Sequence, residues 1–199
     1  FYSDLYDYHE KMKIKADEDY IINTEEYKDI ITKYKKDFDR FLSNSFYNDI
    51  YLICKKHGHI MYSHSQQEDL GKNIPNSNLK NSPIDLIWQK IISSESFSLI
   101  DFQQYSPKKN HPIFFGGVPL YDNGNNIVGV VVVQIKKDLI NEIMNERKGL
   151  GKTGETYLVG SDYLLRSDSN LDTDRNVINS FLKKQTIKTQ SVQEALNGK

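Results

Sequence analysis

Hydrophobic residues recur along this chain with two spacings, one typical of strands and one typical of helices. An apolar run near the middle of the chain gives the clearest strand signal. Residues 127–135 hold five valines, two isoleucines and no charged side chain. Such a β-branched run is typical of a strand covered on both faces, and it is too short to cross a membrane as a helix. Residues 112–120 form a second apolar run, and Asn123-Gly124 between the two favours a tight hairpin turn. The alternating pattern of side chains in residues 98–103 predicts a third strand beside these two runs.

The first half of the chain predicts two more strands and three helices. Residues 49–54 and 59–64 read as a hairpin around Gly58. Helices are expected over residues 1–15 and, from Pro83, over residues 83–94. Asn23 with Glu26 has the pattern of a helix start, and the helix after it carries an apolar stripe. That stripe predicts a helix docked on its own sheet or in a dimer contact, and it consists of Tyr27, Ile30, Ile31, Tyr34, Phe38, Phe41 and Leu42.

The order of these elements predicts the α+β class, with helices before, between and after five strands grouped as two and three. The order resembles that of a PAS-like sensor module. Residues 157–159 and 164–169 repeat the pattern of 51–53 and 60–65, with the triplets 106 positions apart, which indicates the start of a second PAS-like module. That module is incomplete by Lys199, since no further strands follow. We therefore predict an N-terminal helical region over 1–45, a ligand-binding module over 46–148, and the beginning of a second module over 149–199.

Charge and cysteine content exclude several functions. The net charge is −1, with 26 basic and 27 acidic residues mixed along the chain, so nucleic acid is not an expected partner. Cys54 is the one cysteine and excludes an internal disulfide. No apolar run approaches 20 residues. Because the chain opens at Phe1 rather than at methionine, we expect an excised part of a longer protein.

The short motifs do not indicate an enzyme or a bound cofactor. Residues 149–154 match GxGxxG, but the predicted order of helix, glycines, strand is the reverse of the order in a dinucleotide site. Gly149 is therefore interpreted as the stop of a helix over residues 137–148. No serine or cysteine sits in a nucleophile pattern. A PAS domain with haem or flavin has no supporting residue beyond scattered histidines. We therefore predict no catalytic activity and no cofactor.

Two groups of residues have spacings that metals use. Residues 168–174 carry alternate oxygen side chains, but Thr173 and Asn179 stand where a calcium loop needs glycine and glutamate, so a solvated acidic turn is favoured. His57, His59 and His64 suggest zinc, yet no further ligand set completes the site, so exposed turn histidines are favoured. We predict no metal site.

A ligand pocket is the remaining candidate site. Small-molecule pockets combine apolar or aromatic walls with a few polar groups. We expect aromatic walls from Tyr62, Trp88 and Phe114, hydrogen-bonding groups from Asp101, Gln103 and Tyr105, and an anion contact from His111. The alternative is that the strand face with Asp101 and Gln103 is simply solvated, and that the basic loop near His111 is exposed.

Three blocks of sequence resemble the double Cache sensor domains of bacterial chemoreceptors and of some histidine kinases and cyclases. The blocks are FYNDIYLICKKHGHIMYSHSQQEDLGKNI (46–74), DFQQYSPKKNHPIFFGGVPLYDNGNNIVGVVVVQI (101–135) and GLGKTGETYLVGSDYLLRSDS (149–169). The resemblance implies an extracytoplasmic domain of a membrane receptor, flanked by transmembrane helices, that binds a ligand in the membrane-distal module. The arginine- and tryptophan-containing motif for amino acids is not evident in 98–121, so an α-amino acid is not the expected ligand.

We therefore expect an extracytoplasmic chemoreceptor domain that binds a small polar or anionic metabolite, such as an organic acid, and acts as a homodimer. The alternatives are the sensor of a histidine kinase or cyclase, or a ligandless module for dimerisation or partner binding. The sequence does not identify the ligand, the output domain or the oligomeric state.

Overall fold

The computed structural model describes residues 1–146 and 148–198. The chain folds as two units, one formed by Phe1–Asp101 with Phe114–Ile135 and the other by Phe102–Ile113 with Lys136–Lys199. The division into residues 1–45, 46–148 and 149–199 stays a prediction. Within the described residues, no helix has both the length and the apolar character that crossing a bilayer requires.

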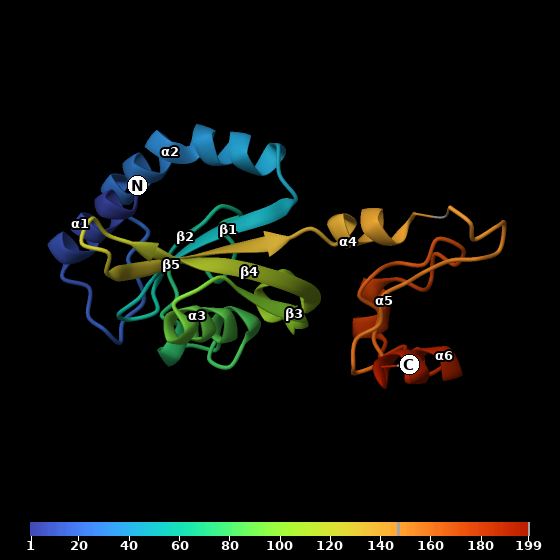
Figure 1. The fold of residues 1–199 in the computed structure, drawn as a ribbon. Coiled ribbons are helices and arrows are strands. Elements are labelled where there is room, and N and C mark those ends of the chain that lie inside the picture. Colours follow the sequence, from blue (N-terminus) through green and yellow to red (C-terminus); the bar gives the residue numbers. More distant parts are fainter. Residues whose placement is uncertain (147, 199) are drawn as a thin grey trace. The chain divides into compact units, whose positions relative to one another are not determined.

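One five-stranded antiparallel sheet holds the valine-rich run at its centre (Figure 1). The sheet order is β2-β1-β5-β4-β3. Val132 of the central strand lies opposite Tyr51 on one side and Gly117 on the other. The predicted α+β, PAS-like fold is thus confirmed. The strands are β1 Tyr47–Cys54, β2 Ile60–Ser63, β3 Ser98–Tyr105, β4 His111–Tyr121 and β5 Ile127–Ile135.

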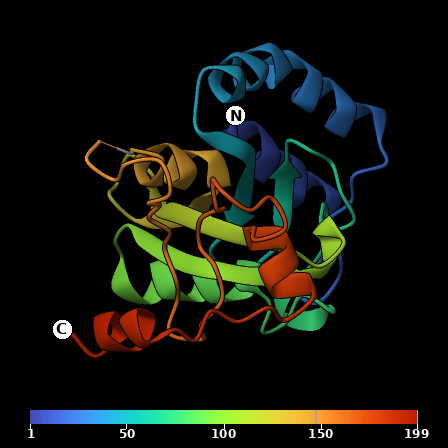
Figure 2. The ribbon, with the colours of Figure 1, turned by 90° about the vertical axis from the view of Figure 1, so that its right-hand side faces the viewer.

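Helices cover both faces of the sheet in the first unit, as Figure 2 shows. Helices α1 (Tyr2–Met12) and α2 (Glu25–Ser43) lie on one face, and α3 (Pro83–Ser94) lies on the other. The α3 face is filled by the protein's own side chains, because Tyr51, Phe115 and the α3 isoleucines that face it are completely buried. Gly117 permits this close packing, since a Cβ there would lie 2.7 Å from Ile91 Cδ1.

Most of the predicted stripe of α2 faces α1 and the sheet, whereas Phe41 is exposed. Tyr27, Ile31 and Leu42 are buried, and the stripe joins the same apolar core as Leu5 of α1 and Leu52 of β1. The stripe therefore docks on its own unit, which was one of the two interpretations of the pattern.

Three local predictions need correction. The N-cap of α2 is Thr24 rather than Asn23, because the Thr24 hydroxyl accepts the Tyr27 N–H at 3.1 Å. In the β4–β5 turn, Asn125 takes the positive φ of 61°, while the Asp122 carboxylate accepts N–H groups across the turn. Helix α4 (Lys137–Met144) ends five residues before Gly149, which was the predicted stop.

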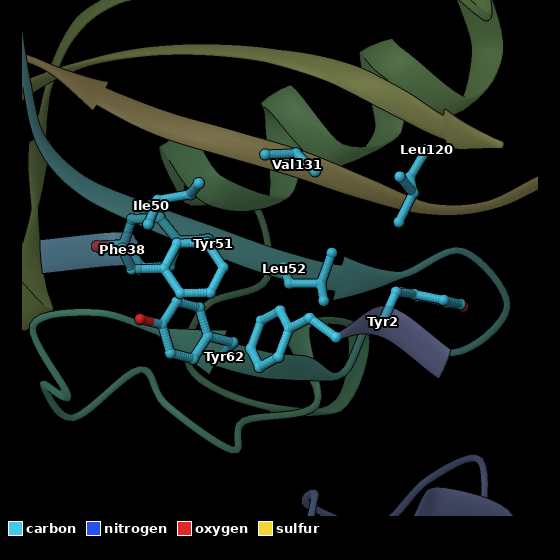
Figure 3. Close-up of a pocket in the computed structure, with 9 residues that line it drawn as sticks. Tyr2, Phe38, Ile50, Tyr51, Leu52, Tyr62, Leu120 and Val131 are labelled. Carbon is cyan, nitrogen blue, oxygen red and sulfur yellow. The ribbon is translucent and has the colours of Figure 1, made fainter. Parts of the chain in front are cut away.

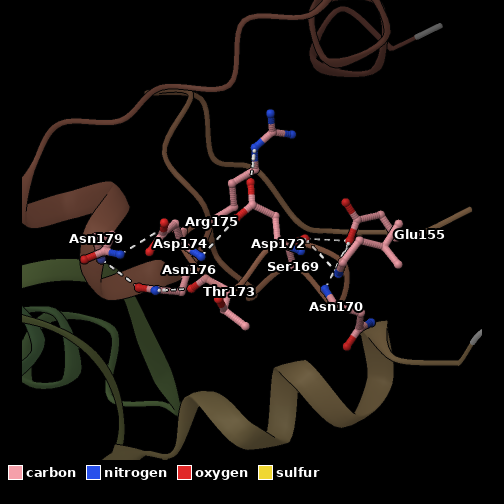
Figure 4. Close-up of polar contacts among 10 residues, drawn as sticks. Glu155, Ser169, Asn170, Asp172, Thr173, Asp174, Arg175, Asn176 and Asn179 are labelled. Atoms are coloured by element: carbon pink, nitrogen blue, oxygen red, sulfur yellow. Dashed lines mark hydrogen bonds and ion pairs between the residues drawn. The ribbon is translucent and has the colours of Figure 1, made fainter. Parts of the chain in front are cut away.

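The second unit contains α4, α5 (Val177–Leu182) and α6 (Gln190–Leu196). The predicted repeat of the first hairpin is present only as a single antiparallel bridge between Val159 and Leu165. Figure 4 shows contacts of the acidic loop that follows this bridge, residues 168–174. Glu155 Oε2 accepts a hydrogen bond from Ser169 Oγ at 2.7 Å, and Asp172 forms an ion pair with Arg175 at 3.3 Å. The loop is therefore ordered by contacts within the unit.

Asp168 corrects the prediction of a fully solvated acidic turn. Its carboxylate forms an ion pair with Lys137 of α4 and accepts the Val177 N–H at 2.8 Å. Asn141 also donates to it, at 3.0 Å. Asp168 therefore connects α4 to the start of α5, which gives this loop a structural role.

Candidate functional site

The first unit contains a cavity of about 190 Å³ between its N-terminal helices and one face of the sheet. Strands β1, β4 and β5 supply one wall, and α1, α2 and β2 supply the others (Figure 3). Almost all of its lining atoms are carbon atoms of aromatic and aliphatic side chains. The lining residues are Phe1, Tyr2, Phe38, Ile50, Tyr51, Leu52, Tyr62, Leu120 and Val131.

Three aromatic rings form one end of this cavity. The ring centroids of Phe1 and Phe38 are 4.9 Å apart, those of Phe1 and Tyr62 are 5.0 Å apart, and those of Phe38 and Tyr62 are 4.9 Å apart. These separations are those of favourable aromatic pairs. Phe1 lies just before α1, Phe38 lies on α2 and Tyr62 lies on β2. The helical region therefore closes this end of the cavity together with the sheet.

The hydroxyl groups of Tyr62 and Tyr2 at the cavity have hydrogen-bond partners. Tyr62 Oη and His64 Nδ1 are 2.9 Å apart, and His64 Nε2 is 3.1 Å from Asp39 Oδ1. Tyr2 Oη donates to the Val128 carbonyl at 2.6 Å. Burial, together with the nearby carboxylates of Asp49 and Asp39, raises the pKa of Tyr62, so its phenol is neutral. The cavity is thus suited to binding an apolar group.

The structure places two predicted wall residues in different surroundings. Tyr62 lines the cavity. Trp88 lies on α3, where its Nε1 donates to the Cys54 carbonyl at 3.2 Å and its ring packs over Gly58. Of the seven predicted residues, Tyr62 is the one that reaches this cavity among the residues that the structure describes.

The other five predicted residues lie on β3 and β4. Asp101 and Gln103 are exposed on β3, and Tyr105 is buried at the end of that strand. His111 is exposed at the start of β4, and Phe114 is half-buried further along it. Gln103, Tyr105 and His111 belong to the second unit. Their role in ligand binding stays a prediction.

Sequence reasoning missed most of the cavity. Phe38 was assigned to the apolar stripe of α2, and Val131 and Leu120 were assigned to buried strands, without a role in a site. Phe1 and Tyr2 were read only as part of a helix. The density of aromatic residues in the first 62 positions was the available signal, but it does not show which rings surround a space.

The histidines also differ from their prediction. His59 is completely buried, His57 is half-buried, and both flank the turn at Gly58. Burial lowers the pKa of His59 to about 4. The interpretation as exposed turn histidines is therefore wrong for His59, and the structure brings His9 of α1 to the same place.

Comparisons with known proteins give matches among solved structures. No protein-family model matches this sequence, and no curated protein matches it. An extracellular ligand-binding receptor from Desulfohalobium retbaense is 12% identical with a TM-score of 0.48, covering 81% of this chain and 27% of that one. The ligand-binding domain of the Pseudomonas fluorescens chemoreceptor CtaA, in complex with L-isoleucine, is 15% identical with a TM-score of 0.45, covering 76% and 56%. The sensor domain of the Vibrio cholerae histidine kinase DctB is 19% identical with a TM-score of 0.41, covering 57% and 39%.

These three structures are of sensor or ligand-binding domains of receptors, the class that the sequence blocks resemble. This chain spans between 27% and 56% of their lengths.

Proposed function

We propose that this chain is the ligand-sensing part of an extracytoplasmic receptor, and that its ligand places an apolar group in the cavity between α1, α2 and the sheet. The observation that carries the proposal is the apolar cavity of about 190 Å³ inside a PAS-like module. Ligand pockets in proteins are typically larger, about 300–1,000 Å³. The cavity therefore accommodates a small aliphatic or aromatic group rather than a whole cofactor.

The ligand class that fits is a small organic acid with a short apolar group. The apolar walls exclude a bare charge, since an unpaired charge in such a site is strongly disfavoured. The acid group of the ligand then stays at the mouth of the cavity, in contact with water. Butyrate, isovalerate and phenylacetate are suitable probes.

The cavity also offers a way to transmit binding. Phe1, Tyr2 and Phe38 belong to the N-terminal helical region, so a ligand contacts the helices and the sheet at once. A ligand that binds one position of these helices more tightly shifts the population toward it. In the proposed receptor, flanking transmembrane helices carry this shift to a cytoplasmic output domain, either that of a chemoreceptor or that of a kinase or cyclase.

A second function, contact with another copy of the chain, is favoured by apolar side chains near the end of α2. Phe41 and Phe46 are 44% and 48% exposed. The Phe41 ring stacks on Tyr47 with centroids 5.8 Å apart, so this surface is ordered. Light scattering of the chain with and without Phe41→Asp tests whether it supports a homodimer.

The binding experiment compares two substitutions on β5. Val131 lines the cavity, whereas Val133 lies two positions along the same strand, on the same face, and does not line it. We expect isovalerate or phenylacetate to give heat on titration and to raise the melting temperature of the wild type. Val131→Phe fills the cavity and is expected to weaken that binding at least tenfold, while Val133→Phe changes it little. No binding by any of the three acids, or equal loss in the two variants, contradicts the proposal.

A further inference from the structure

Three histidines from two separate segments meet next to the first hairpin. His9 lies in the last turn of α1, and His57 and His59 flank the β1–β2 turn. One ring nitrogen from each lies within 4.8 Å of those of the other two. The ring centroids are 5.3 to 5.7 Å apart. The fold therefore brings together residues 48 or more positions apart, which sequence spacing does not reveal.

Neither ring nitrogen of His9 has a hydrogen-bond partner among the residues that the structure describes. The residue is 7% exposed, and both Nδ1 and Nε2 are buried without a hydrogen bond. Glu10 Oε1 lies 3.4 Å from Nδ1. A buried polar group without a partner costs about 1–3 kcal/mol, so such a group usually has a function or a missing partner. A bound cation would supply that partner.

His59 is oriented as metal-binding histidines are. Its Nε2 lies 2.9 Å from the Glu18 carbonyl oxygen, which can only accept, so Nε2 carries the proton. Nδ1 then bears the lone pair, on the opposite edge of the ring, and lies 3.9 Å from Cys54 Sγ. A hydrogen bond from the second nitrogen to a backbone carbonyl is the common second contact that orients a metal-ligating imidazole.

The turn that carries His57 and His59 is held firmly. Gly58 has a φ of 70°, and a Cβ there would lie 2.8 Å from Pro75 Cδ. Asn73 Nδ2 donates to the His57 carbonyl at 3.2 Å, and the His57 N–H donates to Cys54 Sγ at 3.3 Å. Two of the three ligands are therefore preorganised, and little order has to be gained on binding.

There is also space beside the cluster. A cavity of about 50 Å³ is bounded by His9, His57, Cys54 and Met61 among others. This volume exceeds the roughly 10–15 Å³ of probe-occupied volume that one water needs. In a tetrahedral site with bonds of about 2.0–2.1 Å, ligand nitrogens lie about 3.3 Å apart. From the observed separations of up to 4.8 Å, the three nitrogens would reach this geometry by small side-chain rotations, and a water molecule would take the fourth position.

We propose that His9, His57 and His59 bind a divalent transition-metal ion of the zinc class, with three imidazole ligands and one open position. Imidazole ligands suit Zn²⁺, Co²⁺, Ni²⁺ and Cu²⁺, whereas Mg²⁺ and Ca²⁺ prefer oxygen. Cys54 borders the same space, with its Sγ 3.9 Å from His59 Nδ1. The ion ties α1 to the hairpin, at a place distinct from the apolar cavity.

The test uses the chelator-stripped chain with Zn²⁺ in calorimetry and with Co²⁺ in visible absorption. We expect one Zn²⁺ per chain with micromolar affinity or tighter, and Co²⁺ bands of the intensity that four- or five-coordinate sites give. His57→Gln and His9→Gln are each expected to weaken Zn²⁺ binding at least tenfold. His64→Gln is the matched control, because His64 lies on the same hairpin but outside the cluster, and we expect it to retain the wild-type affinity.

Folding is monitored separately through the melting temperature of each metal-free variant. His57 is half-exposed, so His57→Gln is expected to fold as the wild type does and to lose the increase in melting temperature that Zn²⁺ gives. The proposal is overturned if the folded wild type binds no Zn²⁺ or Co²⁺, or if His57→Gln and His64→Gln bind Zn²⁺ equally. Neither result bears on binding of organic acids in the apolar cavity.

Discussion

Thr24 fixes the start of α2 through its side-chain oxygen. Oγ1 accepts the Tyr27 N–H at 3.1 Å and lies 2.8 Å from the Tyr8 hydroxyl of α1. The same atom therefore caps one helix and connects it to another. Loss of such a cap typically costs about 1 kcal/mol, within a range of about 0.5–2 kcal/mol.

We predict that Thr24→Ala lowers the free energy of unfolding by about 1–2 kcal/mol, because both the cap and the contact with Tyr8 are removed. Asn23→Ala is the control: Asn23 is exposed, and the change is expected to fall within about 0.5 kcal/mol of the wild type. Urea denaturation measures both. Equal destabilisation by the two variants would show that the helix start depends on Asn23, as its sequence pattern suggested.

Single residues were the least predictable part of this chain. Asn23 and Thr24 are both good caps and adjacent, so pattern alone does not choose between them. In the β4–β5 turn, Asn125 rather than Gly124 takes the left-handed conformation, because Asp122 organises the backbone. His59 has the sequence context of an exposed turn, yet it is buried under α1 and the 15–20 segment. In each case the deciding contact comes from a neighbouring segment.

Asp168 shows how one carboxylate holds two elements of the second unit together. Burial raises the pKa of Asp168, but the hydrogen bond from Lys137 and the N–H of Val177 outweigh it, so the pKa is lowered overall. A lowered native pKa means that the unfolded chain takes up a proton first as the pH falls. The stabilisation is therefore complete above the unfolded value of about 4 and is lost as the pH falls through the native pKa.

We predict that Asp168→Asn lowers the free energy of unfolding by about 1–2 kcal/mol at pH 7 and makes it less sensitive to pH below about 4. Urea denaturation at pH 7, 5, 4 and 3 measures the difference from the wild type, which is expected to shrink toward pH 3. Asp174→Asn removes an exposed carboxylate of the same loop and serves as the control. A difference between Asp168→Asn and the wild type that stays constant over this range would contradict the role of the charge.

Elements were predicted better than residues, because periodicity depends on many positions at once. The α3 helix and the central β5 strand have the bounds that their apolar patterns indicate. Helix α4 is shorter than predicted, since the stop was placed at Gly149 and the helix ends at Met144. A hairpin in the second unit was predicted because residues 157–169 repeat the residue types of the first hairpin. There the pattern forms one antiparallel bridge, between Val159 and Leu165, rather than two strands. A strand pattern forms a strand only where a partner strand is available.

At the scale of the whole molecule, the cavity depends on segments that are distant in sequence. Phe1, Phe38 and Val131 meet there, and they come from the N-terminal residue, from α2 and from the central strand. The sequence indicated which strand and helix faces are apolar. It did not indicate on which face of the sheet side chains fill the space completely and on which they leave a cavity. On the α3 side the isoleucines complete the packing, whereas on the α1–α2 side the rings leave a space. Tyr62 of the predicted site lines the cavity, and a ligand role for the predicted residues on β3 and β4 stays a prediction.

If ligand binding is to reach a membrane through the N-terminal helices, its effect must appear in those helices. A bound acid contacts Tyr2 of α1 and Phe38 of α2, whereas α3 packs on the opposite face of the sheet. We therefore predict that saturating phenylacetate slows amide hydrogen exchange in Tyr2–Met12 and Glu25–Ser43 at least threefold more than in Pro83–Ser94. Val131→Phe is the control and should show no such change with the same probe. Protection of α3 with none in α1 or α2 would place the ligand on the other face, and the proposed coupling through the N-terminal helices would then be wrong.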